Sequence, residues 1–183
     1  MIRPTALVLL AMTHPFDTVL FDFQSANHIP WQVVNDDVMG GRSTSRWLRT
    51  NGVAVFQGLV SMKNNGGFAS VRSLPARYDL VGCEAFVLRA RGDGLRYKFM
   101  ARSEQGVDGA LYQSAFTTKR DEWEDHRLPL NGFVATYRGR QLPGEPPLDP
   151  GKVRSLGLLV SDQQEGPFRL EIAWIKATAS ADY

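Results

Sequence analysis

Apolar and polar side chains alternate along most of this chain, and short turn signals interrupt the alternation at regular intervals. A period of two places successive side chains on opposite faces of a strand, so the pattern predicts β-strands and not helices. Asn-Gly and Asp-Gly pairs separate many of the runs, and such pairs are strong hairpin signals because type I′ turns need positive φ. The predicted strands span residues 19–23, 43–50, 53–61, 68–73, 82–91, 95–103, 110–118, 123–130, 155–161 and 168–178.

The predicted fold class is therefore all-β. About ten short strands with turns between them are typical of an antiparallel sandwich or barrel. One turn of helix is expected near residues 150–154, and the Pro-rich segment 141–151 is expected to be a surface loop. We expect a short leader at 1–15, a single domain at 16–178 and a tail at 179–183.

Composition limits the function classes. The chain has 183 residues, enough for one well-buried core, and a formal net charge of only +2, which argues against a dedicated nucleic-acid binder. Its single cysteine, Cys83, excludes an intrachain disulfide and fits a reducing compartment. The apolar run at 6–12 is too short to span a bilayer and has no small-residue cleavage site after it. A cytoplasmic location and no transmembrane segment are expected.

The most specific motif is WQVVNDDVMGGRSTS at residues 31–45. Asn and Asp side chains bond to their own backbone in turns, and paired glycines accept positive φ, so the motif predicts an ordered loop and not a strand. A second Asn-Gly-Gly element follows at 64–67. The favoured interpretation is that Asp36 and Asp37 cap backbone amides and pair with Arg42 or Arg72. Calcium binding is the second interpretation, although the motif lacks the ligand spacing of an EF-hand loop. A pair of catalytic acids is the third.

A row of basic residues forms the second candidate surface. If residues 86–91 and 95–102 form a hairpin through Asp93-Gly94, the apolar residues Phe86, Leu88, Ala90, Tyr97, Phe99 and Ala101 point inward. The same register aligns Arg89, Arg91, Arg96 and Lys98 on one outer surface. This surface is either solvated or a binding face for an acidic partner.

No motif for a catalytic, metal or cofactor site is present. The three histidines are far apart in sequence, and the nucleophile elbow, P-loop and H-E-x-x-H motifs are absent. We therefore expect no enzyme activity, no metal and no cofactor. Exposed aromatic residues could still stack on sugar rings, and the candidate platform is Trp31, Trp47, Tyr97 and Tyr112; Trp174 lies in an apolar row and is expected in the core.

The motif at 31–45 resembles the complex I intermediate-associated protein 30 family. Weaker segments follow in the family's order, among them Phe56-Gln57-Gly58, Asn65-Gly66-Gly67-Phe68, Tyr112-Gln113 and Phe168-Arg169-Leu170. The resemblance covers residues 16 to 178. It implies a galactose-binding-like jelly roll and a non-enzymatic role like that of mitochondrial relatives, which are assembly factors for respiratory complex I. A mitochondrial location is the alternative if the source is eukaryotic.

The leading hypothesis is a binding or assembly module that holds a protein partner. A subunit or an assembly intermediate of a respiratory complex is one such partner. The alternative is a carbohydrate-binding module. The candidate binding residues are Trp31, Asn35, Asp36, Asp37, Met39, Gly40, Gly41, Arg42, Ser43, Asn65, Gly66, Gly67, Arg72, Arg89, Arg91, Arg96, Tyr97 and Lys98.

Overall fold

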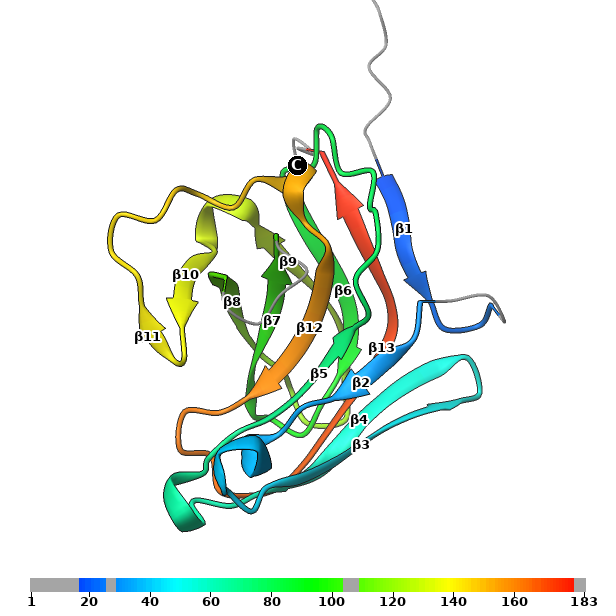
Figure 1. Ribbon diagram of the computed structural model, residues 1–183. Helices are drawn as coiled ribbons and strands as arrows, with labels where there is room; N and C mark the ends of the chain where they lie inside the picture. The colour runs from blue at the N-terminus through cyan, green and yellow to red at the C-terminus, as the bar shows by residue number, and fades with distance from the viewer. Residues whose placement is uncertain (1–16, 26–28, 104–108, 180–183) are drawn as a thin grey trace, which may run out of the picture.

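Two antiparallel sheets pack face to face in the computed structural model, which describes residues 17–25, 29–103 and 109–179 (Figure 1). The all-β prediction is confirmed. The expected leader at 1–15 and most of the expected tail lie outside the described residues, as do His14 and His28.

The first sheet has six strands. Its order is β3 (Thr44–Thr50), β4 (Val53–Val60), β13 (Gly166–Thr178), β6 (Ala85–Arg91) and β9 (Trp123–Pro129), and β1 (Asp17–Asp22) pairs with the second half of β13. The long strand β13 is the centre of this sheet, because β4 and β1 share one of its edges and β6 takes the other.

The second sheet has seven strands. Its order is β11 (Arg140–Gln141), β10 (Val134–Tyr137), β8 (Leu111–Thr117), β7 (Arg96–Arg102), β12 (Ser155–Val160), β5 (Ala69–Ser73) and β2 (Trp31–Val33). The short 3-10 turns are η1 (Asp36–Met39), η2 (Lys63–Asn65), η3 (Leu130–Gly132) and η4 (Pro150–Lys152). Figure 1 shows η1 and η2 beside each other below β2, whereas β10 and β11 lie at the opposite side of this sheet.

All ten predicted strands are present, with ends that differ by up to three residues, and the helical turn near 150–154 is η4. Strands β2, β10 and β11 were not predicted. The expectation that residues 31–33 belong to a loop is wrong, because this segment pairs with β5 at the sheet edge. Pairing with a neighbour decides the conformation of such a short segment, and local propensity does not reveal it.

The core lies between the two sheets and is rich in aromatic side chains. The predicted inward rows of β6 and β7 are fully buried. Phe86 on the six-stranded sheet contacts Phe99 on the seven-stranded sheet at 5.2 Å between ring centroids, and Phe133 lies 5.8 Å from Phe86. These rings join the two layers at the middle of the sandwich.

We predict that Phe86→Ala lowers the free energy of unfolding by about 3–5 kcal/mol, because it leaves a cavity between the sheets. Val81→Ala is the control, since Val81 is 76% exposed and should change stability little. Chemical denaturation measures both. Equal effects of the two substitutions would contradict this account of the core.

Candidate functional site

The outer surface of the seven-stranded sheet carries a groove of about 670 Å³. Side chains of β5, β7, β8 and β12 that point away from the core form its floor. One wall comes from η1 and the other from the turn between β10 and β11. The volume lies within the range of small-ligand sites in proteins.

Asp36 holds the η1 wall in place from beneath. Its side chain is fully buried and accepts four hydrogen bonds, from the Ser43 amide (2.9 Å), the Ser43 hydroxyl (2.5 Å), the Gly67 amide (2.7 Å) and the Phe68 amide (3.2 Å). Burial opposes ionisation of this carboxyl, but the hydrogen bonds together outweigh burial and hold its pKa below the ordinary value. The predicted capping role of Asp36 is confirmed.

Glycine is needed around the Asp36 carboxylate for two different reasons, one of backbone conformation and one of space. Gly40 (φ +87°) and Gly67 (φ +129°) have the left-handed conformation that disfavours other residues. Gly41 and Gly66 are needed for space, because a Cβ on either would overlap a carboxylate oxygen of Asp36. Asn64 adds a link between the loops by donating its side-chain amide to the Gly40 carbonyl at 3.2 Å.

The other residues of the 31–45 motif have separate positions. Asn35 is buried and accepts a hydrogen bond from the Ser45 hydroxyl at 2.7 Å, whereas Asp37, Arg42 and Asn65 are exposed. The predicted ion pairs are wrong: in the described part of the chain neither Asp36 nor Asp37 forms a salt bridge with Arg42 or Arg72. Amides satisfy Asp36 instead, and Asp37 faces solvent.

Val38 and Met39 are the part of this motif that reaches the groove. Both line it, and both are largely exposed, at 70% and 63%. The buried acid thus holds a turn that presents two apolar side chains at the rim. Of the candidate binding residues predicted within the 31–45 motif, Met39 is the one that lines the groove.

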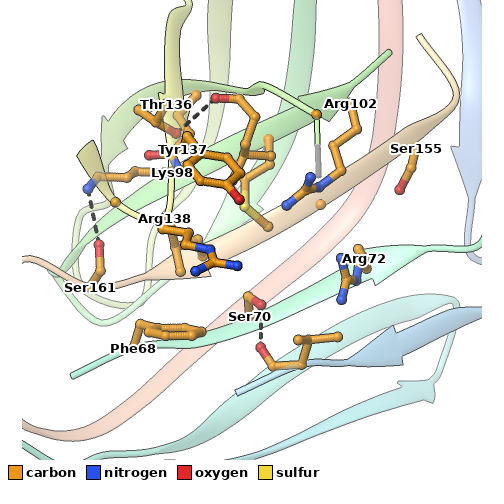
Figure 2. A pocket seen from close by; sticks show the side chains of 18 of the residues that line it. Phe68, Ser70, Arg72, Lys98, Arg102, Thr136, Tyr137, Arg138, Ser155 and Ser161 are labelled. Atoms are coloured by element: carbon orange, nitrogen blue, oxygen red, sulfur yellow. Dashed lines mark hydrogen bonds between the residues drawn. The ribbon is translucent and has the colours of Figure 1, made fainter. Parts of the chain in front are cut away.

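Cationic side chains dominate the polar part of the groove lining. Arg72 comes from β5, Lys98 and Arg102 from β7, and Arg138 from the β10–β11 turn; among the described residues that line the groove, Asp162 is the one carboxylate. Lys98 contacts Asp162 at 2.5 Å and Ser161 at 3.0 Å. Arg138 lies over the Tyr137 ring at 5.2 Å. Figure 2 shows the guanidinium groups of Arg72, Arg102 and Arg138 directed into one space.

The predicted basic row does not exist as one surface. Strand β6 pairs with β13 and β9, whereas β7 pairs with β8 and β12, so Asp93-Gly94 links the two sheets and does not close a hairpin. Arg89 and Arg91 therefore lie on the outside of the six-stranded sheet, where they pair with Asp125 (2.8 Å) and Glu171 (2.5 Å). Arg96 and Lys98 lie on the opposite outer face and both pair with Asp162.

The four proposed sugar-stacking residues also lie elsewhere. Trp31 stacks on Trp47 at 4.7 Å and an interplanar angle of 18°, and both pack against the core, close to Phe21 and Phe23. Tyr97 is fully buried and donates its hydroxyl to Asp93, and Tyr112 is buried and donates to the Pro146 carbonyl. None of the four lines the groove.

Several residues that line the groove were not predicted from the sequence. Arg102 and Met100 share the outward face of β7 with Lys98, so the alternation that located Lys98 could have added them. Phe68, Tyr137 and Arg138 gave no such signal, because they end up in the groove through the loop geometry and through two unpredicted strands.

Within residues 17–25, 29–103 and 109–179, no group of three or more His, Cys, Asp or Glu side chains could hold a metal ion. None of the helical turns there is long and apolar enough to cross a bilayer.

We predict that Asp36→Asn lowers the free energy of unfolding by about 2 kcal/mol or more at pH 7, because buried amide donors lose their acceptor. The folded-state pKa of Asp36 is lowered, so its stabilisation is present above about pH 4 and is lost as the pH falls through the lowered value. Denaturation at a series of pH values should show the two proteins converging in acid. Asp37→Asn is the control, and a loss as large as that of Asp36→Asn would contradict this role.

The family comparison agrees with the motif and the fold. Residues 21–172 match the model of the family described as Complex I intermediate-associated protein 30. The mouse protein named "Complex I intermediate-associated protein 30, mitochondrial" is 27% identical over 166 residues, covering 79% of this chain and 51% of its own length. The Neurospora crassa protein of that name is 25% identical over 146 residues, covering 70% of this chain and 52% of its own. The chain thus spans about half the length of these curated relatives.

The solved structures most similar in shape include carbohydrate-binding modules. A family 11 module of the cellulase Lic26A-Cel5E from Clostridium thermocellum superposes with a TM-score of 0.69 at 14% identity, covering 93% of this chain and 99% of the module. The Clostridium thermocellum module in complex with a β-1,3-1,4-mixed-linked tetrasaccharide gives a TM-score of 0.64 at 16% identity, covering 91% and 98%. Such low identity establishes the jelly-roll fold alone.

The match over residues 21–172, which is most of the domain, shows that this chain belongs to the complex I intermediate-associated protein 30 family.

Proposed function

We propose that this chain is a non-enzymatic binding module that assists the assembly of respiratory complex I by holding a segment of a partner protein in the groove. The names of its relatives support complex I as the assembly concerned. Those names also include the word mitochondrial, so we propose a mitochondrial location if the source is eukaryotic and a cytoplasmic one otherwise.

The observation that carries the proposal is the groove with its rigid apolar rim. Val38 and Met39 are exposed, yet the turn beneath them is tied by the hydrogen bonds to Asp36. A wall that is already ordered before binding loses less conformational entropy when a partner arrives. Flexible methionine side chains also adapt to apolar partners of different shape.

Three of the residues expected from the sequence contact the partner directly in this proposal: Met39, Arg72 and Lys98. Seven others support the wall of the groove: Asn35, Asp36, Gly40, Gly41, Ser43, Gly66 and Gly67. Arg89 and Arg91 have no part in it, since their ion pairs lie on the other sheet.

We predict that Val38→Ser with Met39→Ser impairs complex I assembly without loss of thermal stability, because both side chains are largely exposed. The native host, with its own copy deleted, would be complemented with each variant, and assembled complex I would be measured by NADH dehydrogenase activity in native gels. Leu59→Ser with Val81→Ser is the control, since it removes two exposed apolar residues outside the groove. Normal assembly in the deleted host would refute the assembly role, and full complementation by the rim variant would refute the groove as the site.

Glycan binding is the second candidate, and the fold of the carbohydrate-binding modules favours it. The stacking rings would be Phe68 and Tyr137, which line the groove, in place of Trp31, Trp47, Tyr97 and Tyr112. We predict that a mixed-linked β-glucan tetrasaccharide, tested by calorimetry at millimolar concentration, gives no binding if the protein-partner proposal is right. Binding that Tyr137→Ala abolishes, with an unchanged melting temperature, would favour the glycan.

A further inference from the structure

Two arginines meet in the floor of the groove across a strand that offers almost no side chain between them. Arg72 of β5 pairs with Gly157 of β12, and Arg102 of β7 pairs with Ser155 of the same strand. Both arginine side chains line the groove, and their guanidinium groups point toward the same space (Figure 2). The positive charge of Arg72 contributes, after burial itself, to a lowered pKa of Arg102, as expected for two like charges close together.

Neither guanidinium has a partner in the part of the chain that the structure describes. Among the described residues, neither side chain forms a hydrogen bond or an ion pair, and Arg72 Nε and Arg102 Nη1 are both buried without an acceptor. A buried donor without an acceptor costs free energy, and a half-buried cation without a counter-charge costs more. The next cation along β7, Lys98, shows the contrast, because Asp162 and Ser161 satisfy it.

We propose that Arg72 and Arg102 form a carboxylate-binding site and that the partner segment is acidic. This inference rests on the proposed function and names the chemistry of the segment held in the groove. Planar guanidinium groups match the two oxygens of a carboxylate and bind it through paired hydrogen bonds. An Asp or Glu side chain of the partner would supply those oxygens and the charge that the site lacks.

The surroundings favour an acidic peptide over a free inorganic anion. Met100 and Leu159 lie on the floor beside the two arginines, and Met39 lies at the rim. Apolar side chains next to a charge site suit a peptide in which acidic and apolar residues follow each other. A small ion would leave this apolar surface uncovered.

The test is calorimetric titration of the full chain with hexaglutamate, with hexaglutamine as the neutral probe. We expect hexaglutamate to bind, hexaglutamine not to bind, and the affinity to fall as salt is raised. Arg72→Gln with Arg102→Gln should weaken binding by about tenfold or more. Arg46→Gln with Arg77→Gln is the matched control, because it removes the same charge from two exposed arginines outside the groove and should have little effect.

A thermal readout separates a binding site from a structural role. Without ligand, the groove variant should melt at the same temperature as the parent or higher, since it removes two cations that have no partner. A lower melting temperature would overturn the proposal, and so would equal weakening by the groove and control pairs or no binding by the parent chain. Preferred binding of inorganic phosphate or of hexagalacturonate would also overturn it, in favour of a phosphate or an acidic glycan.

The two proposals can fail separately. If hexaglutamate does not bind while the Val38→Ser with Met39→Ser variant still impairs complex I assembly, the carboxylate site is wrong and the groove function stands. If hexaglutamate binding depends on the two arginines but the host assembles complex I without this chain, the site stands and the assembly role fails.

Discussion

The buried carboxylate of Asp36 is the interaction on which the shape of the groove depends. It joins the η1 turn to Ser43, which lies seven residues later just before β3, and to the segment that leads into β5, which is more distant in sequence. Each neighbour is shaped to admit it, since Gly41 and Gly66 leave the space that a Cβ would fill. Without this carboxylate the amides of Gly67 and Phe68 would be left without their acceptor, and η1 would lose its direct bonds to the segment before β5. Asp36 therefore stabilises the wall of the groove, whereas Asp37 is exposed.

Much of the fold follows from local sequence. Alternation and turn residues are short-range signals, and they predicted the strands and the inward rows of β6 and β7. They do not say which strand pairs with which. Asp93-Gly94 has the composition of a hairpin turn, yet Gly94 (φ +93°) lies in a connection between layers, because β13 and β12 provide the partners of β6 and β7. The error over the basic row of Arg89 and Lys98 is the direct consequence.

The same limit applies more strongly to the site. Arg72 and Arg102 are thirty residues apart, and the strand between them begins at Ser155. No spacing in the sequence relates these three segments; only the non-local order β7-β12-β5 brings them together. The Asp36 loop was predictable because its chemistry is contained in two short motifs. The groove was not, because its floor takes a few outward residues from each of several strands.

The two outer faces of the sandwich treat positive charge differently, and this difference bears on function. On the six-stranded sheet Arg89, Arg91 and Arg169 each have a carboxylate partner. The Arg89–Asp125 pair is exposed and contributes little to stability, whereas Arg91 and Arg169 share the buried carboxylate of Glu171. In the groove, by contrast, burial lowers the pKa of Arg72 and of Arg102, and neither has a partner among the described residues, although desolvation makes a partner more valuable there. Leaving these two guanidinium groups without a counter-charge lowers stability. Such a loss is typical of a binding site, where the ligand supplies the missing charge. The groove face thus carries two half-buried arginines without a partner among the described residues, and the proposed acidic segment would supply their counter-charge.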